Sequence, residues 1–444
     1  MALATAGQRA AISWLRSHSE SKGSVATMNM IEKILARASG RKTAEPGDVV
    51  VAEVDCALLH DLSARSCREV FEKKVGGAMA HPERIITVFD HQFSPPTEDK
   101  ATILRANREF CYRYGMPLYD CGSGNIHNVA VQNGHIKPGA LVVGSDSHSP
   151  VQGVMGCFCA ALGNDSYAAT VMPFSKAWFR VPETIRVELT GQTKPGTTPR
   201  DVALWLCATI GEGKLNYQAI KFCGEYIDSL LFWDRWLFPL MAVDVGAKCA
   251  YIEPDQTTIA FANSVGVTDF EIVRDDPGTQ FAASWRWNVS DLEPQICFPP
   301  TVGNVAPIRD YVGTPIQWAE LGGHGGGRLL DIEMAARVVA QRPKHERVNF
   351  NLVPGNRHVL AEAIKSGDAA LLHERGGTWF PASTGSNQAV NMGAMAAGET
   401  MISTHVRNFP GRNGSPKANM FLASALTVAA AATAGKIVDP REFI

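Results

Sequence analysis

The stretch LVVGSDSHSP, Leu141 to Pro150, opens as a short β-branched run and ends in a cluster of polar side chains. Three more runs have the same form, namely IITVFD at 85–90, TIRVEL at 184–189 and VNFNLVPG at 348–355. Each is followed by a loop and then by helix-like sequence, which is typical of parallel α/β layers. We therefore predict an α/β fold whose polar residues, just past the strand ends, line a ligand site.

Helix signals divide the chain further. In TTPRDVALWLCATIG, Thr198 is a predicted N-cap, Pro199 suits the first turn and Gly211 ends the helix. The stretch from Ser415 to Lys436 shows the same pattern, which predicts a second helix there. Boundary turns at 191–198 and near the prolines at 299–306 divide the chain into three predicted α/β domains, over 1–190, 191–300 and 301–444.

Composition and charge limit the range of partners. The chain has 42 Lys and Arg against 44 Asp and Glu, so its net charge of −2 gives no field that would attract nucleic acid or a membrane surface. No apolar segment reaches membrane length without interruption. The first twenty residues predict an amphipathic helix without the features of a secretory signal. We expect a cytoplasmic protein with a small-molecule partner, and neither nucleic acid nor a membrane.

Acid and histidine residues gather after the apolar runs. A neighbouring carboxylate fixes the tautomer of a histidine and raises its basicity, so such pairs suit proton transfer. Each histidine taken alone is equally consistent with a structural role in a loop, and together they could also hold a metal. The residues are His60, Asp90, His91, His127, Asp146, Ser147 and His148.

Two other stretches stand out in the last third of the chain. Arg407 and Arg412 lie in the glycine-containing loop VRNFPGRNG, where two guanidinium groups could hold carboxylates. LGGHGGGRLLD, Leu321 to Asp331, has five glycines around His324. It lacks the GK[ST] of a phosphate loop and the pattern of a dinucleotide fingerprint, so nucleotide binding is not expected.

Taken together, five motifs resemble the aconitase superfamily, and within it the large subunits of isopropylmalate and homoaconitate dehydratases. They are DHQ, GSDSHS, AVDVGAKCAYIEPDQTT, GGRLLDIEMAARVV and THVRNFPGRNG, in this order along the chain. The resemblance implies three α/β domains around a central cleft and the dehydration and rehydration of hydroxy-polycarboxylic acids. It places the acid and histidine residues above in that cleft, Arg407 and Arg412 on substrate carboxylates, and Asp244 where the family has a glutamate.

The chain also departs from the family pattern. The resemblance implies a [4Fe–4S] cluster held by three cysteines, yet His324, Thr384 and Asn387 stand in the two cluster loops and no cysteine follows Cys297. Iron–sulfur clusters need thiolates, so we expect no cluster and no other cofactor, except for a single divalent metal that His324 could hold. Thr384 and Asn387 are then expected to contact substrate.

The family's swivelling fourth domain, with its serine base, is also not expected in this chain. Isopropylmalate-type enzymes supply it as a small subunit, so such a subunit is a candidate partner.

The sequence therefore predicts a cluster-independent lyase or isomerase, of dehydratase, decarboxylase or cyclase type. Its substrate would be a polycarboxylate or a carboxylated specialised metabolite. Its acid and base groups would be drawn from His91, His127, His148 and His324. Two alternatives remain open: a hydro-lyase with one metal at His324, and a non-catalytic protein that binds a carboxylate or a partner protein. Likewise the glycines around His324 are consistent with either a functional or a space-filling loop.

Overall fold

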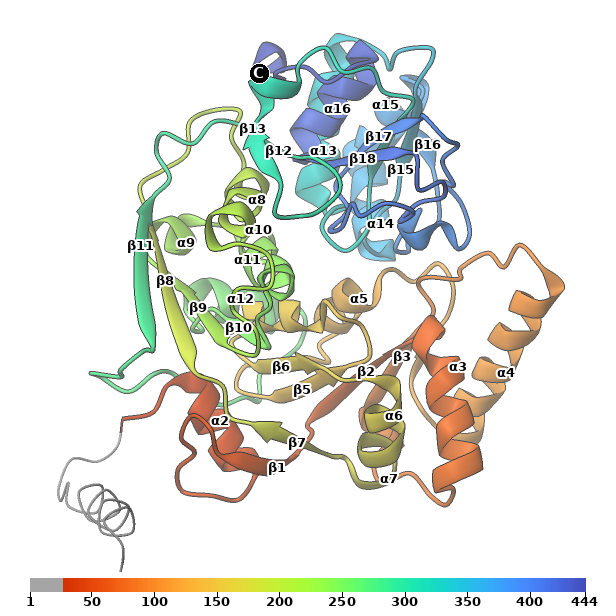
Figure 1. The fold of residues 1–444 in the computed structure, drawn as a ribbon. Helices are drawn as coiled ribbons and strands as arrows, with labels where there is room; N and C mark the ends of the chain where they lie inside the picture. Colours follow the sequence, from red (N-terminus) through yellow and green to blue (C-terminus); the bar gives the residue numbers. More distant parts are fainter. Residues whose placement is uncertain (1–26) are drawn as a thin grey trace, which may run out of the picture.

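The computed structural model describes residues 27–444, and the helix predicted over 1–20 lies outside them. Three sheets with their helices surround a common centre (Figure 1). The α/β fold predicted from the alternation of strands and helices is confirmed, since each sheet is wholly or mostly parallel. Among the described residues no helix is both long and apolar enough to cross a membrane.

The first sheet has five parallel strands in the order β4-β3-β2-β5-β6. Its strands are β2 (Cys56–His60), β3 (Ile85–Val88), β4 (Leu118–Tyr119), β5 (Leu141–Gly144) and β6 (Phe158–Ala161). The helices between them include α3 (Asp61–Val70), α4 (Glu98–Tyr114) and α5 (Ile126–Gln132). A separate antiparallel pair, β1 (Val49–Glu53) with β7 (Lys176–Arg180), lies beside α2 (Met30–Ala38) (Figure 1).

The second sheet has four parallel strands in the order β10-β9-β8-β11. They are β8 (Thr184–Thr190), β9 (Ala219–Cys223), β10 (Cys249–Tyr251) and β11 (Ala283–Asn288). The helices around this sheet are α8 (Pro199–Ile210), α9 (Glu225–Ser229), α10 (Phe232–Arg235), α11 (Leu237–Met241) and α12 (Gln256–Ser264). The domain division at residue 190 stays a prediction, and β8 pairs within this second sheet.

The third sheet has seven strands in the order β13-β12-β18-β17-β14-β15-β16. Its strands are β12 (Gln295–Cys297), β13 (Val305–Pro307), β14 (Trp318–Leu321), β15 (Asn349–Leu352), β16 (Thr378–Trp379), β17 (Thr400–Ser403) and β18 (Asn419–Leu422). Its helices are α13 (Leu329–Gln341), α14 (Arg357–Ser366), α15 (Asp368–Glu374) and α16 (Ala425–Ala434). The prediction of one helix from Ser415 is wrong, because β18 comes first and α16 begins after the N-cap Ser424.

Each of the three sheets has a point where the chain reverses its direction of travel across the sheet, which in the second sheet lies between β8 and β11. In the first sheet the chain moves from β2 to β3 and β4 on one side, and from β5 to β6 on the other. In the third sheet it moves from β14 to β15 and β16, and from β17 to β18. Open α/β sheets bind ligands at the carboxyl ends of the strands beside such a switch point. The loops after these strands in the first and third sheets are therefore candidate ligand-binding positions.

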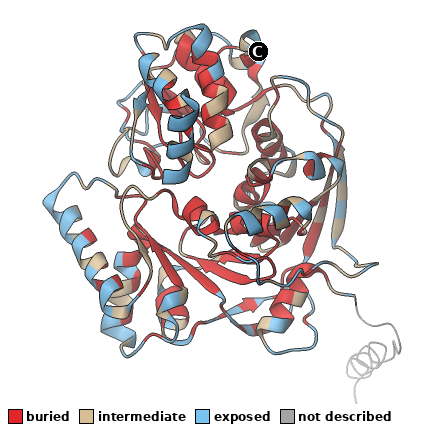
Figure 2. Ribbon diagram, turned by 180° about the vertical axis from the view of Figure 1, so that it is seen from behind, coloured by how far each residue is buried: buried red, intermediate tan, exposed pale blue. Residues whose placement is uncertain are grey.

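The central strands of the first and third sheets are mostly buried, whereas β11 at the edge of the second sheet is partly exposed, and the outer helices expose one face, as Figure 2 shows for α4. All ten cysteines are free, and eight of them are buried. The eight buried cysteines lie in the hydrophobic core, as is usual for free cysteine, and no group of metal-ligating residues within 27–444 includes a cysteine.

Candidate active site

The carboxyl ends of three neighbouring strands bring together most of the predicted site residues. His60 ends β2, Asp90 and His91 follow β3, and Asp146 with His148 follows β5. His127 joins them from the first turn of α5, where Asn125 caps the helix. All of these side chains are buried. Residues separated by up to 88 positions in sequence thus meet beside the switch point between β2 and β5.

The third sheet contributes His324 from the opposite direction. This residue follows β14, and its ring lies 4.8 Å from the His127 ring, 5.5 Å from the His148 ring and 5.6 Å from the His91 ring, measured between centroids. Its Nδ1 is 3.8 Å from Oδ1 of Asp146. The loops after strands of two different sheets therefore share one buried site.

Asp146 contacts three histidines of the site, His127, His148 and His324. Its Oδ1 accepts the backbone N–H of His148 at 2.7 Å and contacts Nε2 of His127 at 3.1 Å. The pKa of Asp146 lies well below its ordinary value: although burial opposes the charged form, the neighbouring His324 and His127 favour it. The carboxylate is thus charged in the folded protein.

A second carboxylate orients His91. Asp90 Oδ1 lies 2.7 Å from Nδ1 of His91, and its Oδ2 accepts the backbone N–H of Ile126 at 2.8 Å. Burial opposes the charge on His91, but Asp90 and then Asp61 raise the pKa of His91 to about 9. Asp90 thus fixes the ring so that Nε2 points away from it.

Three other histidines of the site, His60, His148 and His324, have lowered pKa values. Burial, with repulsion from His91, lowers the pKa of His60 to about 4. Burial is also the main cause of the lowered pKa of His148 and of the much lower pKa of His324. These three imidazoles are therefore favoured in their neutral form, in contrast to His91. His60 is the most structural of them, since its Nε2 bonds the hydroxyl of Ser63 at 2.9 Å.

Arg407 and Asp244 form an ion pair at the edge of the site. Nε of Arg407 donates to Oδ1 of Asp244 at 3.0 Å, and Oδ2 of Asp244 lies 3.5 Å from Nε2 of His148. Both residues line a surface pocket of about 380 Å³, together with Asn408 and Phe409. The Arg407–Asp244 pair is therefore the part of the site that borders this pocket.

The other predicted substrate-binding residues differ in whether they contact the histidines or the backbone around the site. Arg412 contacts the amide of Asn387, whose nitrogen is 3.4 Å from Nε2 of His91. Burial, with repulsion from Arg407, lowers the pKa of Arg412 to about 10. The Thr384 hydroxyl donates to the backbone carbonyl of Asp90 at 3.1 Å, so it holds the loop in place. Ser147 lies 3.3 Å from Nδ1 of His148.

The glycines around His324 are required by close packing. A β-carbon at Gly326 would lie 1.9 Å from Oγ1 of Thr404, and one at Gly325 would lie 2.2 Å from Nη1 of Arg200. Thr404 in turn bonds both the N–H and the carbonyl of Gly322 at 2.9 Å. The segment is therefore a tightly held loop, in which glycine allows close approach of the backbone.

Sequence reasoning missed three groups of supporting residues. Asp61 accepts the backbone N–H groups of residues 90, 91 and 92 at 2.7–3.1 Å and so shapes the turn after β3. Arg200 is buried against the glycine loop and donates to the carbonyl of His405. Glu320, inside a buried strand, contacts Nε2 of His405 at 2.8 Å. The charged residue in the apolar run WAEL was the available signal for this last pair.

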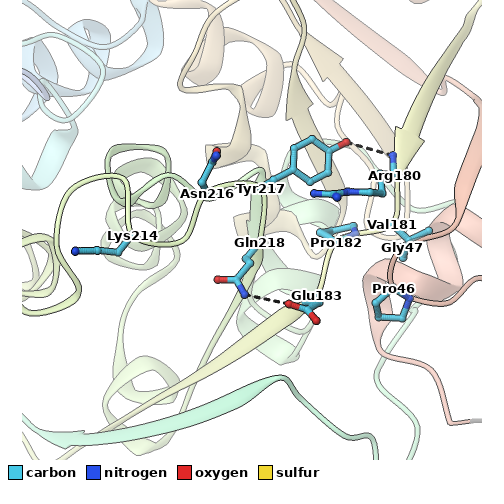
Figure 3. A pocket seen from close by; sticks show the side chains of 10 residues that line it. All are labelled: Pro46, Gly47, Arg180, Val181, Pro182, Glu183, Lys214, Asn216, Tyr217 and Gln218. Atoms are coloured by element: carbon cyan, nitrogen blue, oxygen red, sulfur yellow. Dashed lines mark hydrogen bonds between the residues drawn. The ribbon is translucent and has the colours of Figure 1, made fainter.

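A second pocket lies away from these residues. It has a volume of about 500 Å³ and is lined by residues of the β1–β7 region and the loop before β9, among them Arg180, Lys214 and Tyr217 (Figure 3). The Arg180 guanidinium lies over the Tyr217 ring, 4.9 Å from its centroid. None of the predicted site residues lines this pocket.

Comparisons with known proteins identify relatives across almost the whole chain. The model of the aconitase family (aconitate hydratase) matches residues 32–322 and 306–435. The 3-isopropylmalate dehydratase large subunit 1 of Methanopyrus kandleri is 36% identical over 94% of this chain and 99% of its own length. The probable methanogen homoaconitase large subunit of Methanothermobacter thermautotrophicus is 34% identical over 94% and 98%.

A solved structure shows the same fold at much lower identity. The aconitase X of Thermococcus kodakaraensis, in its holo-form, matches with a TM-score of 0.50 and 12% identity, covering 91% of this chain and 94% of that one. This likeness concerns the fold alone.

These matches correct the expectation of a chain without a cofactor. The chain aligns with dehydratase large subunits over 94% of its length, and the resemblance to their family implies a [4Fe–4S] cluster. The absence of cysteines after Cys297 was not sufficient to conclude that the cluster is absent, and that conclusion is withdrawn.

The side chains near His324 differ from the three cysteine thiolates that hold such a cluster. Two groups of described residues bring ligating atoms close together, and both consist of histidine and aspartate. These donors do not match three thiolates. The proton transfers are therefore assigned to side chains of this chain.

Proposed function

Because the chain belongs to the aconitase family, we propose that it is a lyase that adds or removes water at a hydroxy-polycarboxylic acid. The observation that carries this proposal is the contact between three residues at the solvent side of the site. Arg407 is paired with Asp244 through Nε only, which leaves its outer nitrogens for a carboxylate. His148 lies on the other side of Asp244, where it can exchange a proton with the bound molecule.

The proposed reaction has two proton transfers. When water is removed, the bond from carbon to hydrogen beside a carboxylate breaks and its proton passes to a base. The bond from carbon to oxygen breaks as well, and the hydroxyl leaves as water with a proton from an acid. We assign one of these transfers to Nε2 of His148, since this neutral imidazole is the one in contact with Asp244.

His127 and Asp146 support this residue from behind. The backbone N–H of His148 is bonded to Oδ1 of Asp146, and His127 contacts the same oxygen. Asp146 therefore orients the turn that carries His148 and compensates positive charge that forms during proton transfer.

Turnover of defined acids tests the proposal. Purified protein, together with the small subunit encoded in its own genome, is incubated with 3-isopropylmalate, homoaconitate and aconitate. The ultraviolet absorbance of the conjugated alkene is then followed. We expect turnover of at least one acid, reduced about 100-fold or more in His148→Gln. Full activity of this variant would contradict the role of His148, and no turnover of any acid would contradict the proposed reaction.

The small subunit in this experiment is itself a proposal. The relatives named above are called large subunits, and the chain spans 98–99% of their length. We propose that a small subunit completes the enzyme. Co-purification of a tagged copy with the candidate small subunit supports this, whereas full activity of the isolated chain contradicts it.

The finer predictions of substrate and reaction type stay predictions. A decarboxylase, a cyclase or a carboxylate-binding protein without activity could use the same Arg407. Weaker carboxylate binding in Arg407→Gln, with no turnover in the unsubstituted protein, would identify the non-catalytic alternative. Location in the cytoplasm likewise remains a prediction.

A further inference from the structure

His324 is a buried imidazole for which the described part of the chain supplies no hydrogen bond. Neither Nδ1 nor Nε2 has a hydrogen-bond partner, and only 3% of the residue is exposed. Buried polar groups in proteins are paired with protein groups, water or a ligand, because an unpaired one loses its hydration without compensation. His324 therefore points to a missing partner at this position.

The atoms around His324 are those that bind a metal ion. One ligating atom each from His91, Asp146 and His324 lie within 4.8 Å of one another, and all three residues are buried. Ligands of a tetrahedral zinc ion, with bonds of about 2.0–2.1 Å, are separated by roughly 3.3 Å. If these side chains moved by about 1 Å, their three ligating atoms would reach the spacing needed to bind one ion.

The residues behind these three atoms hold them in the orientation that a metal requires. Asp90 contacts Nδ1 of His91 at 2.7 Å, so Nε2 is the nitrogen left for an ion, which would displace the proton on Nε2 and its 3.4 Å contact with the Asn387 amide nitrogen. A carboxylate behind a ligating histidine is the usual second layer of metal sites in proteins. Asp146 receives the His148 N–H and the His127 contact on Oδ1 alone, and no hydrogen bond to its Oδ2 occurs in residues 27–444.

A neighbouring group of the same residue types does not have these properties. His60, Asp61, Asp90 and His91 also lie close together. However, the Asp61 oxygens accept three backbone N–H groups, and both oxygens of Asp90 have partners. The oxygens of these carboxylates already accept hydrogen bonds that shape the turn. The group with His324 is therefore the better candidate for a metal site.

We propose that His91, Asp146 and His324 bind one divalent first-row transition metal ion in a two-histidine, one-carboxylate site. Imidazole and carboxylate donors without a thiolate suit Zn²⁺, Fe²⁺ or Mn²⁺, and three protein ligands leave positions open for a ligand. A metal here would polarise a substrate oxygen. The inference uses the same site as the proposed function, but metal binding can be measured without turnover.

Titration of the chelator-treated, untagged full chain tests the inference. Co²⁺ is followed by the absorption bands of the bound ion and Zn²⁺ by calorimetry. We expect one ion per chain, with affinity weakened about 100-fold or more in His324→Gln and in Asp146→Asn. We also expect the metal to raise the unfolding temperature of the unsubstituted chain but not of these variants. His358→Gln, an exposed histidine of α14, is the matched control and should bind normally.

Four results would overturn the inference. They are failure of the unsubstituted chain to bind either ion, unchanged affinity in His324→Gln, equal loss in His358→Gln, and iron with stoichiometric inorganic sulfide in the anaerobically purified protein. The proposed function has a separate outcome. Metal binding without turnover rejects the lyase proposal alone, and turnover that is unaffected by chelation, in protein that binds no metal, rejects the metal site alone.

Discussion

His127 and His148 show how one carboxylate organises several histidines. Both contact Oδ1 of Asp146, one through its ring nitrogen and the other through its backbone N–H. A buried acceptor of this kind fixes which ring nitrogen of His127 carries a proton, and it orients the backbone turn that carries His148. The chemistry of the site therefore depends on a residue that need not touch the substrate carboxylate.

Arg407 gives the first prediction at this scale. Replacing it with glutamine removes the charged donor for a carboxylate, so we expect kcat/KM to fall by a factor of about 10–100, corresponding to about 1.5–3 kcal/mol. Steady-state kinetics with the best acid from the turnover test measures this. Arg105→Gln, at an exposed position of α4, is the control. Equal kinetics in the two variants would contradict the role of Arg407.

Sequence reasoning identified these side chains but not their supports. His60, Asp90, His127 and Asp146 could be found because polar residues stood directly after apolar runs. Asp61 and Arg200 could not be assigned, since their partners are backbone groups that come close only after folding. The signal for a residue of this kind lies in three-dimensional contacts rather than in spacing.

At the scale of elements, the glycine loop joins two strands of the third sheet. Thr404, just after β17, bonds both backbone groups of Gly322, which follows β14. The carboxyl ends of the two strands at the switch point are thereby tied together, and His324 is carried between them. Glycine is needed in this loop because the backbone after β14 passes so close to Thr404.

Gly326→Ala tests this role. The added methyl group would lie 1.9 Å from the Thr404 hydroxyl oxygen, so Thr404 must move and its bonds to Gly322 weaken. We expect the free energy of unfolding to fall by about 1–3 kcal/mol, measured by denaturant titration. Gly163→Ala is the control, because it has no atom within 4 Å of the new carbon and no positive φ. A stable Gly326→Ala variant would contradict the packing argument.

Helix α8 provides a pH-dependent prediction. Asp201 accepts the N–H of Thr198 within its own helix cap at 2.7 Å and that of Gln295, the first residue of β12, at 2.8 Å. Burial raises the pKa of Asp201 to about 6, above its ordinary value of 3.8. The folded state therefore binds more protons than the unfolded state between these values, and the free energy of unfolding falls as pH rises through this window.

The size of this effect is at most about 3 kcal/mol. We expect the difference in unfolding free energy between the unsubstituted protein and Asp201→Asn to change in this direction from pH 4 to pH 7. Denaturant titrations at several pH values measure it. A difference that does not vary with pH would show that Asp201 does not contribute through its protonation.

Elements were predictable where local and tertiary preferences agree. The cap, the proline and the terminal glycine of α8 all appear in the sequence, and the structure has the helix at Pro199–Ile210. The stretch from Ser415 carries similar signals, but residues 419–422 pair with β17. Pairing in the sheet outweighed the local signal for an earlier helix start, and Ser424 is the N-cap.

At the scale of the whole molecule, the switch points of two sheets face one site. His60 and Asp146 come from the first sheet, while His324 and Arg407 come from the third. The first sheet supplies His148 and the third supplies Arg407, the two residues to which the proposed function assigns proton transfer and carboxylate binding. The order of the strands could not be read from the sequence, although the α/β class could.

A ligand that contacts both the first and the third sheet should slow hydrogen exchange in both. We expect a bound hydroxy-polycarboxylate to slow backbone amide hydrogen exchange both at 144–149 and at 322–327, because each segment contributes to the same site. Mass spectrometry of peptides from both segments measures this. Protection of one segment alone would show that the ligand contacts only one sheet. The pocket around Tyr217 should be unaffected, since none of the site residues lines it.

The crystal structure of the protein with a bound hydroxy-polycarboxylate tests the central claim most directly. The account predicts a carboxylate of the ligand within hydrogen-bonding distance of the Arg407 guanidinium, and its hydroxyl-bearing carbon beside His148 and His324. A ligand bound elsewhere, for example against Arg180 and Tyr217, with the histidine site closed to it, would contradict the account.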